Sequence, residues 1–249
     1  NAPLYLSNIS YYRLKGYWWE MQDDKVNHHF VDGSYFEDVI DLYNFDRHFR
    51  LIVFNAIERI EISLRTKLIN IFSLQYGAEW YLNPVLFEDQ KNYYTFVSKL
   101  FQDVSNSREE FILKHFKNHP DNHPESWKSF EVLTLGSLSK LYANLKHQLP
   151  EKNSIAREFG LYNQKYLSSW LLAITVVRNI IAHHGRLWNR VIINKYDWPL
   201  NIPNIILSYI PNNLQRRKIF PLLSAIIYLN NQISRGNSIK QDFLELFSS

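Results

Sequence analysis

The chain has 249 residues, of which 46% are hydrophobic, and this is enough to bury the core of one large domain. It contains no cysteine, which excludes disulfides and thiolate metal sites and is typical of a reducing compartment. Its formal net charge of +4 is small, so a surface for nucleic acid must come from local clusters of Lys and Arg.

The start of the chain shows no targeting signal. There is neither a run of about 18 apolar residues nor a basic-then-apolar leader, so we expect a cytoplasmic protein without a membrane span. The chain begins at Asn1 rather than at a methionine, which suggests that a preceding segment of the protein is missing from this sequence.

Residues 1–35 form a distinct aromatic and basic amino-terminal segment. Aromatic and cationic side chains are interleaved between Tyr11 and Trp19. Such a segment either packs its rings on the helical core or presents them as a platform for stacked RNA bases. Both interpretations stay open, and we treat Arg13, Lys15 and Tyr17 as candidate RNA contacts.

Residues 36–76 contain neither Gly nor Pro, and their pattern predicts one long amphipathic helix or two in close succession. The apolar residues recur at steps of three and four, at Leu51, Phe54, Ile57, Ile60, Leu64, Leu68 and Ile71. The other face carries Asp46, Arg47, Arg50, Glu58, Arg59, Glu61 and Arg65. A face of this kind, with i,i+4 pairs such as Glu61 and Arg65, is usually solvated.

Further helices are predicted along the rest of the chain, so the expected fold class is all-α. They span residues 90–116 with a break near 105–107, 130–149, 155–159, 166–183, 213–234 and 240–247, with a loop over 196–211. Gly185, just past the helix that ends near His183, is expected to adopt a left-handed conformation. Without repeats or linkers, we expect a single domain over 1–249, with its core in 36–190 and a loop and carboxyl-terminal helices in 191–249.

The segment from Arg178 to Asn189 carries the strongest functional signal. It follows an apolar helical run and contains Arg178, Asn179, His183, His184, Arg186, Trp188 and Asn189. Arginine neutralises a phosphate, histidine transfers protons near neutral pH, and tryptophan stacks on a base or closes a pocket. This combination indicates RNA cleavage.

The spacing of Arg178 and His183 limits how they can cooperate. Five residues at about 100° each place them about 140° apart around a regular helix, so they do not share a face. Either the helix loosens near Ala182 and the long arginine reaches round it, or two subunits supply these residues to one cleft. We favour the shared cleft, because one histidine cannot easily act as base and acid on opposite sides of a phosphate.

Two other groups of residues are weaker candidates. His115, His119 and His123 recur every four residues, but Pro120 and Pro124 interrupt the helix that would align them, so we expect a basic, solvated loop and no metal site. Basic residues elsewhere could contact the RNA backbone, although such charge usually only solubilises. They are Lys140, Lys146, His147, Lys152, Arg216, Arg217 and Lys218.

At the Arg178–Asn189 string a family resemblance becomes evident. The string resembles the Arg-x4-His signature of HEPN ribonucleases, in the form carried by bacterial abortive-infection proteins of the AbiD/AbiF type. Three further segments are similar to that group and stand in the same order, at residues 9–17, 42–65 and 127–142. The resemblance therefore covers most of the chain, up to about residue 190.

The resemblance implies a HEPN-like helical bundle with additional helices at both ends, and a metal-independent endoribonuclease toxin used in phage defence or a toxin–antitoxin pair. Arg178 would bind the scissile phosphate and His183 would act as general acid or base at the interface of a homodimer. The ribose 2′-OH would attack the adjacent phosphate, so no cofactor is needed and DNA is not expected as a substrate. A small structured non-coding RNA would restrain or direct the enzyme.

Supporting roles are expected for the neighbours of this pair. Asn179 would assist Arg178 and His183, and Glu58 and Glu61 could orient Arg178, although surface i,i+4 pairing explains the two glutamates about as well. Three further residues either contact the site or only fix the turn, namely His184, Arg186 and Asn189. For Trp188, packing is the expected role.

A second function class is also compatible with the sequence. In this alternative the chain is a non-catalytic helical RNA-binding protein whose Arg-His motif only grips a cognate small RNA. The catalytic hypothesis is favoured, because a binding module does not need a proton-transfer histidine beside an arginine and an amide.

Overall fold

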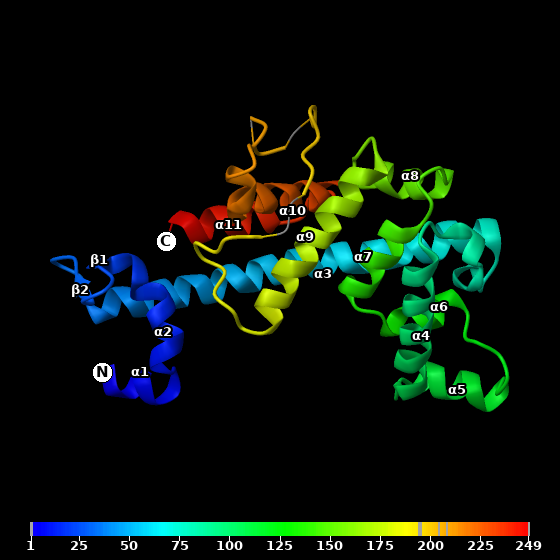
Figure 1. The fold of residues 1–249 in the computed structure, drawn as a ribbon, viewed down its shortest axis with the longest axis horizontal. Coiled ribbons are helices and arrows are strands. Elements are labelled where there is room, and N and C mark those ends of the chain that lie inside the picture. The colour runs from blue at the N-terminus through cyan, green and yellow to red at the C-terminus, as the bar shows by residue number, and fades with distance from the viewer. Residues whose placement is uncertain (1, 194–195, 204, 208, 249) are drawn as a thin grey trace.

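The computed structural model describes residues 2–193, 196–203, 205–207 and 209–248. Within these ranges the chain forms eleven α-helices and one small two-stranded sheet, so the predicted all-α class is confirmed. Helix α3 runs along the long axis of the molecule, and other helices pack along it (Figure 1). Residues 204 and 208 of the predicted loop lie outside the described residues, as do residues 194 and 195 and the end residues 1 and 249.

The elements form an amino-terminal group, the long helix α3, a middle group of six helices and a carboxyl-terminal pair of helices. The amino end comprises α1 (Ala2–Asn8), α2 (Tyr11–Trp18), β1 (Gln22–Asp24) and β2 (His29–Phe30), and α3 (Phe36–Tyr76) follows. Next come α4 (Gln90–Asn106), α5 (Glu110–Asn118), α6 (Ser126–Ser129), α7 (Leu135–Asn144), α8 (Pro150–Glu158) and α9 (Gln164–Ala182). The carboxyl end comprises α10 (Ile219–Ile233) and α11 (Ile239–Ser248). Short 3₁₀ turns span Trp19–Met21, Trp80–Leu82, Pro84–Leu86, Phe130–Val132 and Gln215–Arg217.

Helix α3 is one continuous helix of 41 residues, which gives it a length of about 60 Å. At its start the Asp38 carboxylate accepts the Tyr35 N–H at 2.8 Å, and an acidic group there is favoured by the helix dipole. At its end Gly77 has a φ of 88°, and its N–H donates to the Ser73 carbonyl at 3.0 Å. Only glycine adopts this backbone conformation without strain, so the helix stops there.

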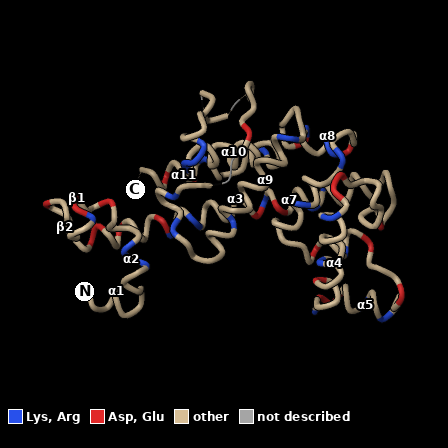
Figure 2. Tube along the Cα trace, viewed as in Figure 1, with Lys and Arg blue, Asp and Glu red and all other residues tan. Residues whose placement is uncertain are grey.

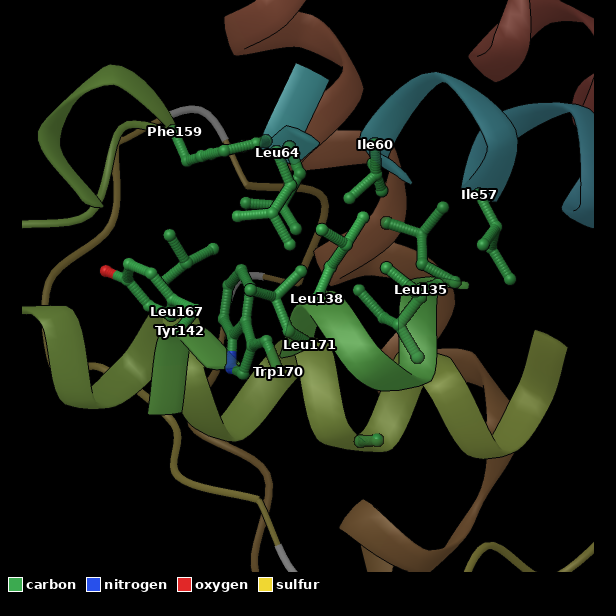
Figure 3. Packing of buried hydrophobic residues seen from close by; sticks show 14 of the residues in the cluster. Ile57, Ile60, Leu64, Leu135, Leu138, Tyr142, Phe159, Leu167, Trp170 and Leu171 are labelled. Atoms are coloured by element: carbon green, nitrogen blue, oxygen red, sulfur yellow. The ribbon is translucent and has the colours of Figure 1, made fainter. Parts of the chain in front are cut away.

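The main core lies where α3, α7 and α9 meet (Figure 3). Ile57, Ile60 and Leu64 of α3 are at most 1% exposed and pack toward the side chains of α7 and α9. Leu51 and Phe54, which were predicted on the same apolar face, are instead 59% and 38% exposed. Leu51 lies on the opposite side of the helix from Ile60, because nine residues at about 100° bring it half a turn round.

Several predicted helix boundaries are corrected by local capping. The helix predicted over 130–149 is only α7 (Leu135–Asn144), since the Thr134 side chain caps it at Ser137 N and Leu145 is extended. The helix predicted over 155–159 begins earlier, at Pro150, because proline is well suited to a first helical position. The predicted break near 105–107 is confirmed by the end of α4 at Asn106.

The amino-terminal segment has a small core of its own against the start of α3. Leu14, Tyr17 and Trp18 of α2 pack with Val39 and Ile40 of α3. Tyr17 is only 1% exposed, so its prediction as an RNA contact is wrong. The β1–β2 hairpin was not predicted, because strands of three and two residues leave no readable alternation.

The carboxyl-terminal helices cover another side of α3. Helix α10 is apolar almost all round and is buried along most of its length, as expected for an internal helix. Its Asn230 amide nitrogen donates to the Ala56 carbonyl of α3 at 3.0 Å. Among the helices of the described residues, none combines the length and the apolar character that a membrane crossing requires.

Lys152, a candidate RNA contact in the sequence, is instead fully buried. Its ammonium group donates to the carbonyls of Ala143 at 3.0 Å and Leu145 at 2.6 Å, where the end of α7 leaves carbonyls without helical partners. Burial lowers the pKa of Lys152 to about 8. The side chain therefore ties α8 to α7 and cannot reach RNA.

The substitution Lys152→Met is expected to change how stability depends on pH. The pKa of Lys152 is about 8 in the folded state and 10.5 ordinarily, so the unfolded state binds more protons between these values. The free energy of unfolding of the wild type relative to Lys152→Met should rise over this pH range, by at most about 1.4 kcal/mol per pH unit. Urea unfolding at several pH values measures this difference in the free energy of unfolding. Lys91→Met, at an exposed lysine, is the control. A difference between wild type and Lys152→Met that does not change with pH would contradict the lowered pKa of Lys152.

Candidate functional site

Helix α9 ends in a tight turn inside the motif. His184 is left-handed with a φ of 56°, its N–H donates to Ile181 O at 2.8 Å, and the Gly185 N–H donates to Ile180 O at 2.8 Å. These two bonds define a Schellman motif. The prediction of a left-handed conformation at Gly185 is therefore wrong by one position, because His184 adopts it instead. Glycine is favoured at position 185 for a different reason, because a Cβ there would lie only 3.0 Å from the Ile180 oxygen.

A buried carboxylate on α3 fixes the chain that follows this turn. Asp46 is 0% exposed, and its Oδ1 accepts the N–H groups of Leu187 at 3.0 Å and Trp188 at 2.6 Å. Its Oδ2 accepts the Tyr17 hydroxyl at 2.7 Å, and Arg50 Nε lies 3.5 Å from the same oxygen. We call these five residues the Asp46 cluster. The prediction that this face of α3 is solvated is thus wrong at Asp46 and Arg50.

Three arginines fasten the turn from other sides. Arg50 and Arg13 both donate to the His184 carbonyl, at 2.8 Å and 2.7 Å. Arg186 donates to the Gly16 carbonyl of α2. His184 therefore contributes its backbone to the turn while its side chain is exposed, and Arg13 and Arg186 are engaged in holding α2 against the motif.

Arg178 faces a cavity of about 280 Å³ between α9 and α3. Its Nε is buried and has no hydrogen-bond partner, and the ion pairs formed among the described residues do not include Arg178. The cavity is lined by Phe54, Ile57, Glu58, Glu61, Ile62, Arg65 and Arg178. The structure therefore brings Arg178 together with both glutamates that the sequence singled out.

The electrostatics of this cavity leave Arg178 available for an anion. Burial raises the pKa of Glu61, while Arg65, Arg178 and the Leu135 N–H each act to lower it. Arg65 is already engaged, because its Nη2 lies 3.2 Å from Glu61 Oε1 and donates to the Leu133 carbonyl at 2.9 Å. Glu61 thus shares its charge between two arginines, of which only Arg65 is paired with it.

His183 does not line the Arg178 cavity. It caps α9 and is exposed, as is Asn179 one turn earlier. Steps of four, three and four residues place Leu172, Val176, Asn179 and His183 on one face of α9, about 100–160° from Arg178. One chain therefore presents the two principal candidates in different directions. Asn189, with a φ of 49°, lies exposed beyond the turn.

The candidate RNA-contacting cations are spread over the molecule. Lys and Arg are interspersed with Asp and Glu along the chain (Figure 2), in keeping with the small net charge. Lys140, Arg217 and Lys218 are exposed, whereas Lys15 and Lys146 are half-buried. Arg216 donates to the carbonyls of Tyr196 at 2.9 Å and Pro211 at 3.0 Å, so it supports a loop.

The histidines of α5 and of the loop that leads to α6 are not all solvated. His115 is 5% exposed, and its Nε2 lies 3.1 Å from the Asn122 carbonyl oxygen. The His123 ring stacks on Phe101 at 4.1 Å. The prediction of a solvated loop is therefore wrong at His115. No group of three or more His, Cys, Asp or Glu suited to a metal ion occurs in the described part of the chain.

Sequence reasoning missed the structural importance of Asp46 and Arg50. A signal was present, because Asp46 is in phase with Val53 and Ile57, seven and eleven residues further along the same helical face. A carboxylate in register with buried apolar positions indicates a buried anion with partners. The two backbone amides that donate to Asp46, at Leu187 and Trp188, are more than 140 positions away and could not be found by spacing.

A comparison with known protein families matches the part of the chain that forms this site. A model of the family described as Abi-like protein matches residues 4–189, which include α2, α3 and the whole motif turn up to Asn189. No curated protein and no solved structure gives a significant match to the chain.

Replacing Asp46 by Asn should destabilise the fold. The variant keeps the shape of the side chain but leaves Arg50 as a buried cation without its counter-charge, which typically costs about 3–5 kcal/mol. Urea unfolding should show this loss, and amide hydrogen exchange at Leu187 and Trp188 should accelerate. The exposed Asp41→Asn on the same helix is the control, and equal stability of the two variants would refute the role of Asp46.

Proposed function

The chain belongs to the Abi-like protein family, which supports a role in abortive infection and phage defence, and from this premise we propose that it is a metal-independent endoribonuclease. The proposal rests on the motif in which an arginine, an amide and a histidine stand at the end of one helix. A small structured RNA would serve to restrain or direct the enzyme.

One observation carries the proposal, namely the Arg178 guanidinium facing a cavity with a buried Nε that has no partner. A buried donor without an acceptor is costly, and a phosphate oxygen is the acceptor that best matches guanidinium. Glu61 lines the same cavity and attracts Arg178 electrostatically without forming an ion pair with it. Arg178 would therefore bind the scissile phosphate and stabilise the charge of its transition state.

The chemistry would be an attack by the ribose 2′-OH on the adjacent phosphorus. The bond to the 5′-oxygen breaks, leaving a 2′,3′-cyclic phosphate and a 5′-OH, and the proton lost by the 2′-OH is balanced by one given to the leaving oxygen. His183 would transfer one of these protons, and its exposure at the end of α9 leaves it accessible to RNA. We assign the second proton transfer to a second histidine, because one imidazole cannot easily act on both sides of the phosphate.

A second copy of the chain would supply that histidine. The surface beside the Arg178 cavity carries apolar side chains that a monomer would not need to expose, since Leu51, Phe54 and Ile62 are 59%, 38% and 51% exposed. They lie within about 80° of one another on α3. An apolar patch of this kind, beside the Arg178 cavity, suits a two-fold interface with a cleft shared by both motifs.

The first test removes each catalytic group. Arg178→Ala and His183→Ala should each lower the rate of cleavage of single-stranded RNA in EDTA by about 10²-fold or more, without abolishing RNA binding. The products should carry a 2′,3′-cyclic phosphate and a 5′-OH. Gel analysis of a labelled RNA, after removal of any bound RNA, gives both results.

Matched controls are Arg190→Ala, exposed beyond the turn, and His119→Ala, exposed after α5. Both should cleave as the wild type does. Persistent cleavage by Arg178→Ala and His183→Ala would exclude the assigned residues, and a requirement for divalent metal would exclude the mechanism. An inactive wild type that still binds RNA would favour a non-catalytic RNA-binding protein.

The second test concerns the shared cleft. Leu51→Asp should place a charge in the interface outside the Arg178 cavity, yield a monomer in sedimentation velocity, and lose cleavage in proportion to the dimer lost. Leu74→Asp is the control, because Leu74 is 89% exposed near the far end of the same helix. A monomeric Leu51→Asp protein that cleaves at the rate of the wild type would show that one chain forms a complete site.

A further inference from the structure

A second cavity lies at the amino-terminal end, between α2, the β1–β2 hairpin and the start of α3. Its volume is about 390 Å³, within the range of about 300–1,000 Å³ common for small-molecule sites. Its aromatic lining comes from all three elements and comprises Tyr11, Trp18, Phe30, Tyr35 and Phe36. Among the described residues that line it, none is an Asp, Glu, Lys or Arg.

The cavity has one polar group that the fold leaves unsatisfied. Gln22 lines it and is only 6% exposed, yet its side-chain Oε1 is buried without a hydrogen-bond partner. An acceptor left in this state costs about 1–3 kcal/mol, so a ligand that donates to it gains this free energy. Because the last torsion of a glutamine side chain has a broad minimum, the oxygen can turn toward a donor in the cavity.

These features define the chemistry of the ligand. Aromatic walls favour a flat π system, and the Tyr11 and Trp18 rings already contact each other with centroids 5.0 Å apart. The glutamine amide pairs with a group that offers a donor and an acceptor side by side. A nucleobase has both properties, since its faces stack and its edge carries N–H donors beside N or O acceptors.

The surroundings of the cavity suit a base that is part of a strand. Lys15 and Lys25 lie with their ammonium groups 5.8 Å and 5.5 Å from the centroid of the Trp19 ring, which directly follows Trp18. Phosphates outside the cavity would meet these cations. Helix α2 also connects the cavity to the motif turn, because Tyr11 lines the cavity while Arg13 donates to the His184 carbonyl.

We propose that this cavity binds one unpaired nucleobase, stacked on its aromatic walls and hydrogen-bonded to the Gln22 carboxamide, and thereby selects which RNA reaches the Arg178 site. The inference rests on the proposed function for the source of the base. It assigns sequence preference to α2 and the hairpin, whereas phosphate chemistry stays with α9.

The test uses RNA that cannot be cleaved, so that binding is measured independently of catalysis. Short 2′-O-methyl homopolymers of A, C, G and U, and the four free nucleosides, are titrated against the tryptophan fluorescence of the full chain. We expect the four homopolymers to bind with different affinities. Tyr11→Ala and Tyr35→Ala should weaken the preferred one about tenfold, and Gln22→Met should reduce the differences among the four.

Tyr12→Ala is the matched control, because Tyr12 is 83% exposed on the same helix and does not line the cavity. It should bind as the wild type does, and circular dichroism melting checks that all variants are folded. Nucleosides that bind with the same dependence on Tyr11 and Gln22 would show that the base alone suffices. Binding by the homopolymers only would show that the base is read within a strand.

The inference is overturned if folded Tyr11→Ala, Tyr35→Ala and Gln22→Met bind every homopolymer as tightly as Tyr12→Ala does. This result is separable from a failure of the proposed function. A protein that selects among uncleavable homopolymers through this cavity but cuts no RNA would disprove the ribonuclease alone. A ribonuclease whose binding ignores all three variants would disprove the base pocket alone.

Discussion

The architecture of the site depends on one buried anion. Removing a carboxylate from water costs several kcal/mol unless hydrogen bonds and a counter-charge replace the water. In this fold Asp46 obtains them from the Tyr17 hydroxyl, the Leu187 and Trp188 amides and the Arg50 guanidinium. Since these groups come from α2, α3 and the chain after α9, satisfying the anion requires all three segments to meet. The motif is therefore held to α3 by electrostatics as well as by apolar packing.

This constraint fixes the directions in which the candidate residues point within one chain. Fixed by the Asp46 cluster and the Schellman turn, the end of α9 directs Arg178 toward the Glu61 side of α3 and leaves His183 at the surface. The same α2 that donates Tyr17 to the cluster also carries a wall of the aromatic cavity. The groups proposed for phosphate binding, proton transfer and base recognition thus lie on separate surfaces that are connected through the Asp46 cluster.

Sequence periodicity predicted the helices better than it predicted their environment. Apolar residues at steps of three and four and the absence of Gly and Pro identified α3 as a long helix. Helix α3 ends before Gly77 and helix α4 ends at Asn106, where the sequence predicted helix ends. The same steps placed Leu51 in the core, although it is exposed. Asp46 and Lys152 were taken for surface charges, because their partners lie on other elements. Short-range patterns report local geometry, whereas burial of a charge depends on long-range contacts that spacing does not encode.

The sequence distance bridged by the Asp46 cluster has a consequence for biosynthesis. Asp46 and Leu187 are 141 positions apart, so on the order of ten seconds of translation separate them. Until Leu187 emerges from the ribosome, the carboxylate lacks two of its donors and the turn that carries the motif does not exist. The ribosome is itself largely RNA, and a nascent chain proposed to cleave RNA is therefore synthesised without a formed site. The site can form only after most of these 249 residues have emerged from the ribosome.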